Sequence, residues 1–334
     1  MNRNERIAAF VGLGDVIKNL EQGEWQEIHI SAGNDNAWFT PDSVTTALSS
    51  LSTWLSEDSL SAWTQAYDEP SVSKRVAIVM AGNIPLVGFH DLLAVLISGH
   101  HAVVKLSSKD QFLPKWVIQK LNDINPAFAT RVTFVEQLRD FDAVIATGSD
   151  NSARYFDYYF GKYPNIIRRN RTSVAVLTGK ESIEEHQHLG NDVFTYFGLG
   201  CRNVSKLFVP TDYSFESLFD SWNKFSPVIN HHKYANNYDY QKSILLINRN
   251  DFFDTGFVIA QESDRIVSPI SVLYYETYDS EENLKMKLSG NSEKIQCVVG
   301  SIPGVAEIAF GKAQHPQLTD YADRVDVMTF LSKL

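Results

Sequence analysis

Short apolar runs alternate with longer amphipathic stretches along most of the chain after Ser73. We expect a strand at each run rich in β-branched residues, because such runs are typical of strands buried on both faces. The predicted strands are 75–80, 102–106, 132–135, 143–147, 173–177, 206–209, 244–247, 267–275 and 295–299. Helices are predicted between them at 84–98, 111–121, 151–160, 184–196 and 281–288. The alternation predicts an α/β fold with a parallel sheet, in which ligands gather at the carboxyl ends of the strands.

The region before Ser73 is predicted to be mostly helical. Thr40-Pro41-Asp42 indicates a helix start, since threonine caps helices well and proline is tolerated in the first turn. Apolar residues then recur at helical spacing, at Leu48, Leu51, Trp54 and Leu55.

The length of 334 residues accommodates two domains of ordinary size. We expect one domain over 1–199 and a second over 200–334, whose last segment returns to the first domain. Hydrophobic residues make up 44% of the chain and charged residues 21%, which is typical of a globular protein.

The chain has a formal net charge of −10 and no long run of lysine or arginine. Both features argue against a nucleic-acid-binding protein, which usually carries a basic patch. The short basic cluster of Arg168, Arg169 and Arg171 either ends a strand or faces an anionic ligand. No apolar run approaches the ~20 residues that span a bilayer, and the N-terminus does not read as a signal peptide. Two cysteines cannot form a disulfide framework. We therefore expect a cytoplasmic protein.

Cys201 is the first candidate for chemistry. Gly198 and Gly200 precede it and allow a tight turn with close ligand approach, and Arg202 could favour the thiolate. The alternative is a small apolar side chain that fills a helix–strand junction. Cys297 stands inside an apolar strand and is expected to be part of the core.

Two further strand–helix junctions carry polar residues. Asn83 could donate an N–H to a developing oxyanion, or it could cap the helix that follows. At Thr147-Gly148-Ser149, backbone N–H groups and a helix N-terminus could bind a pyrophosphate, although the full dinucleotide fingerprint is absent. A plain helix cap by Ser149 or Asp150 is the alternative there.

The strand predicted at 102–106 ends in a segment with two lysines and two serines. This segment could receive an adenosine ribose, or it could form a solvated turn. Its residues are Lys105, Ser107, Ser108 and Lys109.

The histidines show no spacing typical of zinc ligands. His100-His101 and His231-His232 are adjacent pairs, and neighbours in sequence point to different sides of a strand. His186 and His188 stand two apart on a predicted helix and do not face each other. We expect no metal site.

Together and in this order, these segments resemble the aldehyde dehydrogenase superfamily, and within it the LuxC-like acyl-CoA reductases of bacterial bioluminescence. The segment 82–86 is similar to the superfamily's Asn-Phe-Pro segment. The strand with Lys105 resembles the strand that contacts the adenosine ribose, and Thr147-Gly148-Ser149 resembles the pyrophosphate turn. Gly200-Cys201 resembles the nucleophile segment, and Asp323-Arg324-Val325-Asp326 is similar to the tail of the branch.

The resemblance implies an aldehyde-dehydrogenase-like fold, with a parallel-sheet cofactor domain and a smaller α/β catalytic domain. It implies that Cys201 is the nucleophile and that Asn83 donates to the oxyanion. The lysines suit a 2′-phosphate, so NADPH is expected in preference to NADH, with CoA as the leaving group. The implied cofactor-binding residues are Lys105, Ser107, Ser108, Gly148, Ser149 and Glu262.

Two departures from the superfamily pattern affect the mechanism. Hydrolytic members carry a glutamate that activates water, but this chain reads Arg169-Asn170-Arg171-Thr172-Ser173-Val174 there, with no carboxylate. Arg265 stands where a glutamate would hold the nicotinamide ribose, and Glu262 or Asp264 would substitute for it.

We therefore expect an acyl-CoA reductase that forms the aldehyde through a thioester on Cys201. The missing glutamate fits this hypothesis, because none of its steps uses water as a nucleophile. Alternatives are a reductase of acyl phosphates or acyl adenylates, or a non-catalytic binding protein. A third is a thiol acyltransferase or hydrolase with His186, His188 or His231 as its base. We expect a homo-oligomer that binds acyl-CoA, but neither nucleic acid nor a membrane.

Overall fold

The computed structural model describes residues 1–334, apart from the side chain of Asp150. The chain divides into two compact units, of which the first comprises Met1–Asn170 and Gln317–Leu334 and the second Arg171–Pro316. This division falls earlier than the predicted boundary at 199/200. The reason is that β6 (Thr172–Val176) pairs with β7 (Val204–Pro210), so both strands belong to one sheet.

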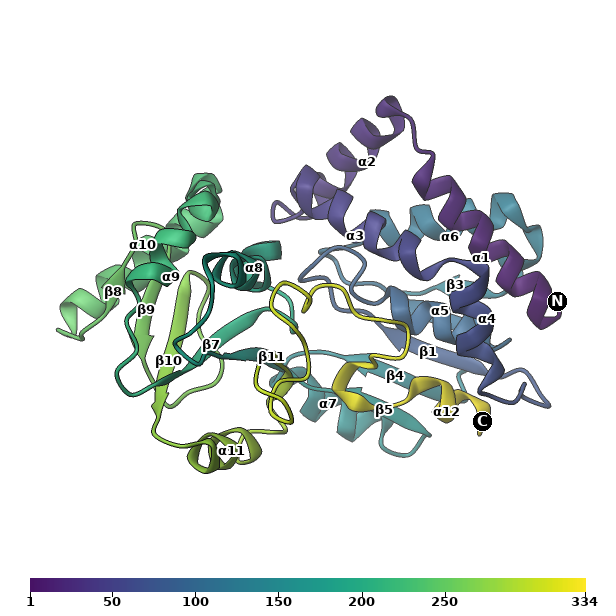
Figure 1. Ribbon diagram of the computed structural model, residues 1–334. Coiled ribbons are helices and arrows are strands. Elements are labelled where there is room, and N and C mark those ends of the chain that lie inside the picture. Colours follow the sequence, from purple (N-terminus) through teal and green to yellow (C-terminus); the bar gives the residue numbers. More distant parts are fainter. The chain divides into compact units, whose positions relative to one another are not determined.

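The first unit is built on a parallel sheet whose strand order, among the described residues, is β3-β2-β1-β4-β5 (Figure 1). Ile78 in the central strand lies opposite Val104 of β2 and Ile145 of β4. The strands are β1 (Arg75–Val79), β2 (His101–Lys105), β3 (Val132–Phe134), β4 (Ala143–Thr147) and β5 (Asn165–Arg168).

Helices cover both faces of this sheet. Alternate residues of a strand point to opposite faces. Ile78 therefore joins the large apolar cluster with α1, α3, α5, α6 and α12, whereas Ala77 packs with Phe156 and Phe160 of α7. The helices are α1 (Arg3–Lys18), α2 (Gln22–Asp35), α3 (Pro41–Trp54), α4 (Glu57–Gln65), α5 (Phe89–Ile97), α6 (Phe112–Ile124), α7 (Asp150–Phe160) and α12 (Val327–Ser332).

The second unit contains a sheet ordered β11-β6-β7-β10-β9-β8 among the residues described, parallel except for the β8–β9 pair. Leu189 and Leu218 pack α8 and α9 on one face, and Leu284 packs α11 on the other. Its further strands are β8 (Phe253–Asp254), β9 (Ile259–Glu262), β10 (Val272–Tyr278) and β11 (Ile295–Gly300). Its helices are α8 (Ile183–Phe194), α9 (Glu216–Ser221), α10 (His232–Ile247) and α11 (Glu281–Ser289).

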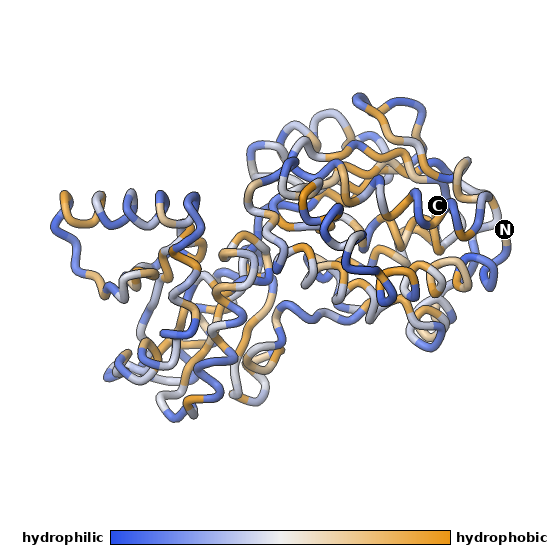
Figure 2. The backbone as a smooth tube through the Cα atoms, turned by 90° about the horizontal axis from the view of Figure 1, so that it is seen from above, coloured by the Kyte–Doolittle hydropathy of each residue, from blue (hydrophilic) through white to orange (hydrophobic). Residues whose placement is uncertain are grey.

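Figure 2 shows hydrophobic stretches running through the interior of each unit and hydrophilic ones along the outer loops. The predicted α/β class with a parallel sheet is confirmed. No helix in the described part of the chain combines the length and the apolar character needed to cross a membrane.

Three predicted elements are wrong in type or extent. The run 244–247 is the end of α10 and not a strand, because an apolar run this short has no decisive periodicity. The helix predicted at 84–98 begins only at Phe89, since Leu86 adopts a φ of 57° in a turn. The strand predicted at 267–275 begins at Val272, after Ser271 with a φ of 67°.

Candidate active site

Polar candidate residues follow three neighbouring strands at the carboxyl edge of the first sheet. β1 is central, and the chain continues to β2 on one side and later to β4 on the other. In open parallel sheets, ligands bind at the carboxyl ends beside such a reversal of strand order. Asn83 follows β1, Ser107 and Ser108 follow β2, and Gly148 and Ser149 follow β4. The candidate residues of the first unit thus lie on three adjacent strand ends.

Asn83 is half-buried in a bend between β1 and α5. The N-cap of α5 is Gly88, which makes no side-chain cap bond, so Asn83 does not cap this helix. The capping alternative is therefore wrong. An amide side chain at the end of a central parallel strand is compatible with a role in oxyanion stabilisation.

Neighbouring loops hold the turn that contains Asn83. Asn36 Nδ2, just after α2, donates to the Gly82 carbonyl oxygen at 3.2 Å. The Leu86 backbone N–H donates to Asp110 Oδ2 at 2.8 Å. Gly82 also packs directly on Ser107, because a Cβ at Gly82 would lie 2.6 Å from Ser107 Oγ. Asn36 and Asp110 were not among the predicted site residues.

The segment after β2 combines structural and exposed polar groups. Ser107 Oγ accepts a hydrogen bond from the Lys109 N–H at 3.2 Å, whereas the side chains of Ser108 and Lys109 are exposed. Lys105 Nζ donates to the Glu136 carbonyl oxygen at 2.5 Å. An ammonium carries three donors, so this bond leaves two N–H groups of Lys105 for an anion.

The turn after β4 begins helix α7. Ser149 is the N-cap of this helix, and its hydroxyl oxygen accepts a hydrogen bond from the Ser152 N–H at 3.3 Å. A Cβ at Gly148 would lie 2.8 Å from both Phe156 Cε2 and Ser152 Cβ, so only glycine fits. The capping role of Ser149 is confirmed, and it is compatible with an anion at the same helix N-terminus.

In the second unit, Cys201 lies on a turn between α8 and β7. Tyr196, Phe197 and Gly198 adopt φ angles of 53°, 57° and 77°, so the backbone winds left-handed immediately before the cysteine. Such a conformation is strained for the two aromatic residues and must be held by the surrounding structure. Cys201 is partly exposed, and it forms no disulfide among the described residues.

Asn203 holds this turn, although sequence reasoning missed it. The Gly200 N–H donates to Asn203 Oδ1 at 2.8 Å, and the Asn203 N–H donates to the Gly200 carbonyl oxygen at 3.0 Å. Asn203 Nδ2 lies 2.7 Å from the Thr195 carbonyl oxygen and 3.0 Å from that of Asp192. The side chain therefore satisfies carbonyl groups left open at the end of α8. Only the asparagine two residues after the cysteine could have signalled this role.

Ser173 supports the backbone of the nucleophile candidate from β6. Its hydroxyl donates to the Cys201 carbonyl oxygen at 3.1 Å and lies 3.0 Å from Cys297 Sγ. Cys297 is only 3% exposed, and burial raises the pKa of its thiol to about 11. The prediction that Cys297 belongs to the core is confirmed. Of the two cysteines, Cys201 is the partly exposed one, which is compatible with nucleophilic chemistry.

Glu262 belongs to the same sheet as β7, the strand that follows Cys201. It is exposed at the carboxyl end of β9 and is level with Tyr275 of β10, which is level with Leu207 of β7. Cys201 precedes the amino end of the parallel strand β7. Glu262 is thus level with the middle of β7, whereas Cys201 stands before the first residue of that strand. Thr172 and Ser173 lie at the amino end of β6, the same end of the sheet as the turn of Cys201.

The basic cluster serves mainly structural contacts. Arg168 forms a buried ion pair with Asp91 of α5, and Arg169 forms an exposed one with Asp157 of α7. Arg171 Nη1 donates to the Ser292 carbonyl oxygen at 3.3 Å. Strand β5 ends at Arg168, which supports the alternative that this cluster ends a strand.

The three histidines considered as bases have different surroundings. His186 is buried in α8, which lowers the pKa of its imidazole, and His188 is exposed. The ring of His231 packs on Phe197, with 4.6 Å between centroids, and thus lies beside the turn that leads to Cys201. The described residues include no group of three His, Cys, Asp or Glu side chains that could hold a metal.

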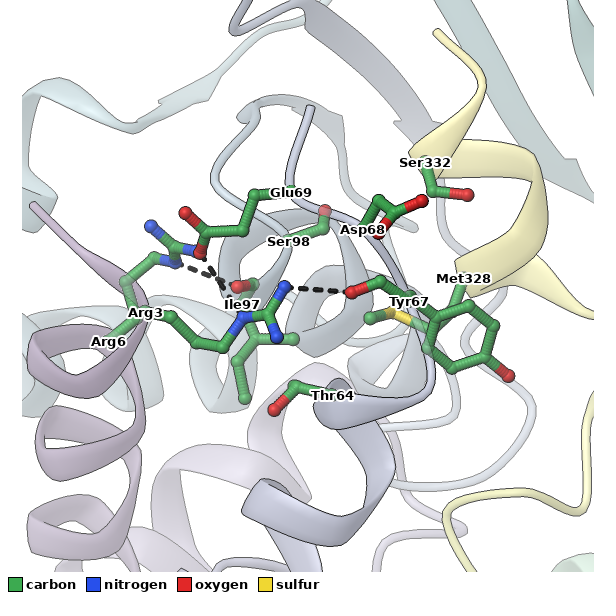
Figure 3. A pocket seen from close by; sticks show the side chains of 10 residues that line it. All are labelled: Arg3, Arg6, Thr64, Tyr67, Asp68, Glu69, Ile97, Ser98, Met328 and Ser332. Carbon is green, nitrogen blue, oxygen red and sulfur yellow. Dashed lines mark hydrogen bonds and ion pairs between the residues drawn. The ribbon is translucent and has the colours of Figure 1, made fainter. Parts of the chain in front are cut away.

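A small polar pocket in the first unit is lined by none of the candidate site residues (Figure 3). It lies beside Ile97 at the end of α5, and therefore toward the amino edge of the sheet, away from Asn83. Figure 3 shows that Arg6 and Glu69 form an ion pair in it, and that Arg3 Nη2 donates to the Tyr67 carbonyl oxygen at 2.8 Å. These contacts tie α1 to the segment after α4, which indicates a structural role.

A family model described as acyl-CoA reductase (LuxC) matches residues 42–216, which is more than half of the chain. The chain belongs to the acyl-CoA reductase (LuxC) family. No curated protein matches the sequence. Membership of the LuxC family supports chemistry of the aldehyde or acyl reductase type, and it confirms the predicted family.

Solved aldehyde dehydrogenases have a similar fold. Aldehyde dehydrogenase 21 from Physcomitrella patens, in complex with the reaction product succinate, has a TM-score of 0.70 at 12% identity, covering 100% of this chain and 84% of that one. An NAD+ complex of aldehyde dehydrogenase from Bacillus cereus has a TM-score of 0.65 at 14% identity, covering 93% of this chain and 76% of that one. Indole-3-acetaldehyde dehydrogenase from P. syringae, in complex with NAD+, has a TM-score of 0.67 at 14% identity, covering 93% of this chain and 76% of that one. The aldehyde-dehydrogenase-like fold is thereby confirmed.

Proposed function

We propose that this member of the LuxC family reduces an acyl-CoA to the aldehyde with NADPH, through a thioester on Cys201. The observation that carries the proposal is the turn of Cys201: this residue is partly exposed on a backbone that Asn203 and Ser173 hold in place. In this proposal the first unit binds the cofactor and the second carries the nucleophile.

The chain's own groups would act in two stages. The Cys201 thiolate attacks the acyl carbonyl carbon, and the Asn83 side-chain N–H together with the Cys201 backbone N–H stabilises the oxyanion. The tetrahedral centre then collapses, the bond to the CoA sulfur breaks, and the acyl group remains on Cys201. Neither stage needs water, which agrees with the absence of a carboxylate in the segment 169–174.

The carboxyl edge of the first sheet fits a dinucleotide by the chemistry of its donors. Lys105, Ser108 and Lys109 offer cationic and hydroxyl donors, and Ser149 marks the N-terminus of an eleven-residue helix. Such a helix N-terminus attracts phosphate oxygens. When bound, the reduced nicotinamide would supply the hydride. Solved neighbours of the same fold carry NAD+, which supports a nicotinamide cofactor.

The test of this proposal is the intact mass of the protein after mixing with a panel of acyl-CoAs, without cofactor. We expect one acyl group to be added per chain, followed by aldehyde formation when NADPH is supplied. Acylation by acyl phosphates or acyl adenylates, but not by acyl-CoA, would instead support those substrates.

Asn83→Ala is expected to lower turnover on the order of 10²-fold, as the loss of one oxyanion donor typically does. The variant should stay folded, because the loss of one side-chain hydrogen bond costs only about 1 kcal/mol. Steady-state kinetics and thermal unfolding of the same preparation check both expectations. Normal turnover in this variant would refute the oxyanion role.

Lys105→Ala is expected to weaken NADPH binding more than NADH binding, because a lysine recognises the extra 2′-phosphate charge. The measurement is the Kd of each cofactor in variant and wild type, by fluorescence titration. Lys115→Ala, which removes an exposed lysine of α6, is the matched control and should change neither Kd. Equal losses for both cofactors in Lys105→Ala would contradict the assignment.

A further inference from the structure

Asp110 is a buried carboxyl group beside the turn that carries Asn83. Its residue is 3% exposed, and its Oδ2 accepts the Leu86 backbone N–H at 2.8 Å. Oδ1 is fully buried and has no hydrogen-bond partner among the described residues. Burial, together with the negative charge of Asp35, raises the pKa of Asp110 to about 7. Burial of a carboxyl group with one unpaired oxygen costs free energy.

The geometry of the turn explains what this carboxyl group does. Leu86 adopts a φ of 57°, which is uncommon for a branched residue and needs to be held by its surroundings. The bond from Asp110 fixes the Leu86 amide, three residues after Asn83. A Cβ at Gly82 would lie only 3.3 Å from Asp110 Cβ, so the loop with Asp110 also packs against the start of the turn.

The end of α2 ties both loops together. Asp35 Oδ2 accepts the N–H groups of Gln111 and Phe112 at 2.8 and 2.6 Å, and so caps α6 from another helix. Asn36 Nδ2 donates to the Gly82 carbonyl oxygen. The turn of Asn83 is therefore held at its first residue by Asn36 and at Leu86 by Asp110.

We propose that Asp110 is a positioning residue that fixes the Asn83 amide for the reacting oxyanion, with Asn36 as its partner at the other end of the turn. The inference rests on the proposed function, because Asp110 would affect the reaction only through Asn83. A misplacement of about 1 Å in a catalytic group can cost on the order of 10²-fold in rate. Asp110→Ala should therefore lower the rate of Cys201 acylation roughly 10- to 100-fold.

A double-mutant cycle separates positioning from general stability. We expect Asp110→Ala to slow acylation strongly in the wild type, but less than about 2-fold in the Asn83→Ala background, where no amide is left to position. Asp110→Asn keeps the shape of the neutral acid and an acceptor for Leu86, and should retain acylation within about 3-fold of wild type. Asp123→Ala, an exposed carboxylate of α6, is the matched control.

Three results would overturn the inference. If the fold-losses in acylation rate of Asp110→Ala and Asn83→Ala multiply in the double variant, Asp110 acts independently of Asn83. The proposed function would still stand. A slow Asp110→Asn variant would mean that the acceptor is not what matters. No effect of Asn83→Ala would remove the oxyanion role itself, and with it this inference. If Asp110→Ala does not fold, the same cycle is run with Asn36→Ala, which should show the same non-additivity with a smaller effect.

Discussion

Cys201→Ala is expected to abolish both acylation of the protein by acyl-CoA and formation of aldehyde. Removing the nucleophile of a covalent mechanism leaves only binding and the oxyanion donors, and losses on the order of 10⁶-fold in turnover are typical. Intact mass spectrometry should show one acyl group on wild type and none on the variant, and peptide mapping should place it on Cys201.

Cys297→Ala is the matched control for this experiment. Its thiol is buried, and burial raises its pKa to about 11, so it carries almost no thiolate at neutral pH. Ser173 should still donate to the Cys201 carbonyl oxygen in this variant, and acylation should persist. Acylation of Cys297, or turnover by Cys201→Ala, would refute the mechanism and favour a binding protein or another nucleophile.

The alternation of apolar strands and amphipathic helices was enough to predict the parallel sheets. Strands β1, β2 and β4 begin and end within about a residue of their predicted bounds, because they are central and read as continuous apolar runs. The sequence could not separate helix from strand at 244–247, where four apolar residues stand together. Strands β5 and β9 were missed, since both are short and include polar residues.

The candidate site could be predicted only where the residue type and its neighbours in sequence indicate the chemistry. A cysteine after two glycines and an asparagine after a strand are visible in one sequence. Asn203, Ser173 and Asp110 act through bonds to backbone groups elsewhere in the chain, so their roles depend on tertiary geometry. The position of Glu262 relative to β7 depends on strand register, which no local pattern encodes.

The supports of the Cys201 turn also bear on what can happen to an acyl-enzyme. At the amino end of β6, Thr172 Oγ1 donates to Asn203 O at 3.1 Å, and Ser173 donates to Cys201 O. These hydroxyls are thus committed to the backbone, and neither can act as a strong base at neutral pH. In the second unit, His231 is the base candidate packed beside the turn, through Phe197.

In the oxidative direction, with aldehyde and oxidised cofactor but without CoA, the enzyme is expected to stop after one turnover per site. General-base activation of water typically contributes ~10²–10⁴-fold, and the segment 169–174 offers no carboxylate for it. The acyl group should therefore remain on Cys201, visible by intact mass as one adduct per chain. Adding CoA should restart turnover by at least about 10²-fold and release acyl-CoA.

The same experiment separates the proposed function from its alternatives. Sustained release of free fatty acid without CoA would mean that a residue of this chain activates water, and His231→Ala should then abolish the release. An acyl-enzyme that CoA cannot relieve would mean that CoA is not the acyl carrier, and phosphate or AMP should be tried in its place. Only release that depends on CoA agrees with a turn whose polar groups hold the backbone of Cys201 and leave its thioester to an incoming thiol.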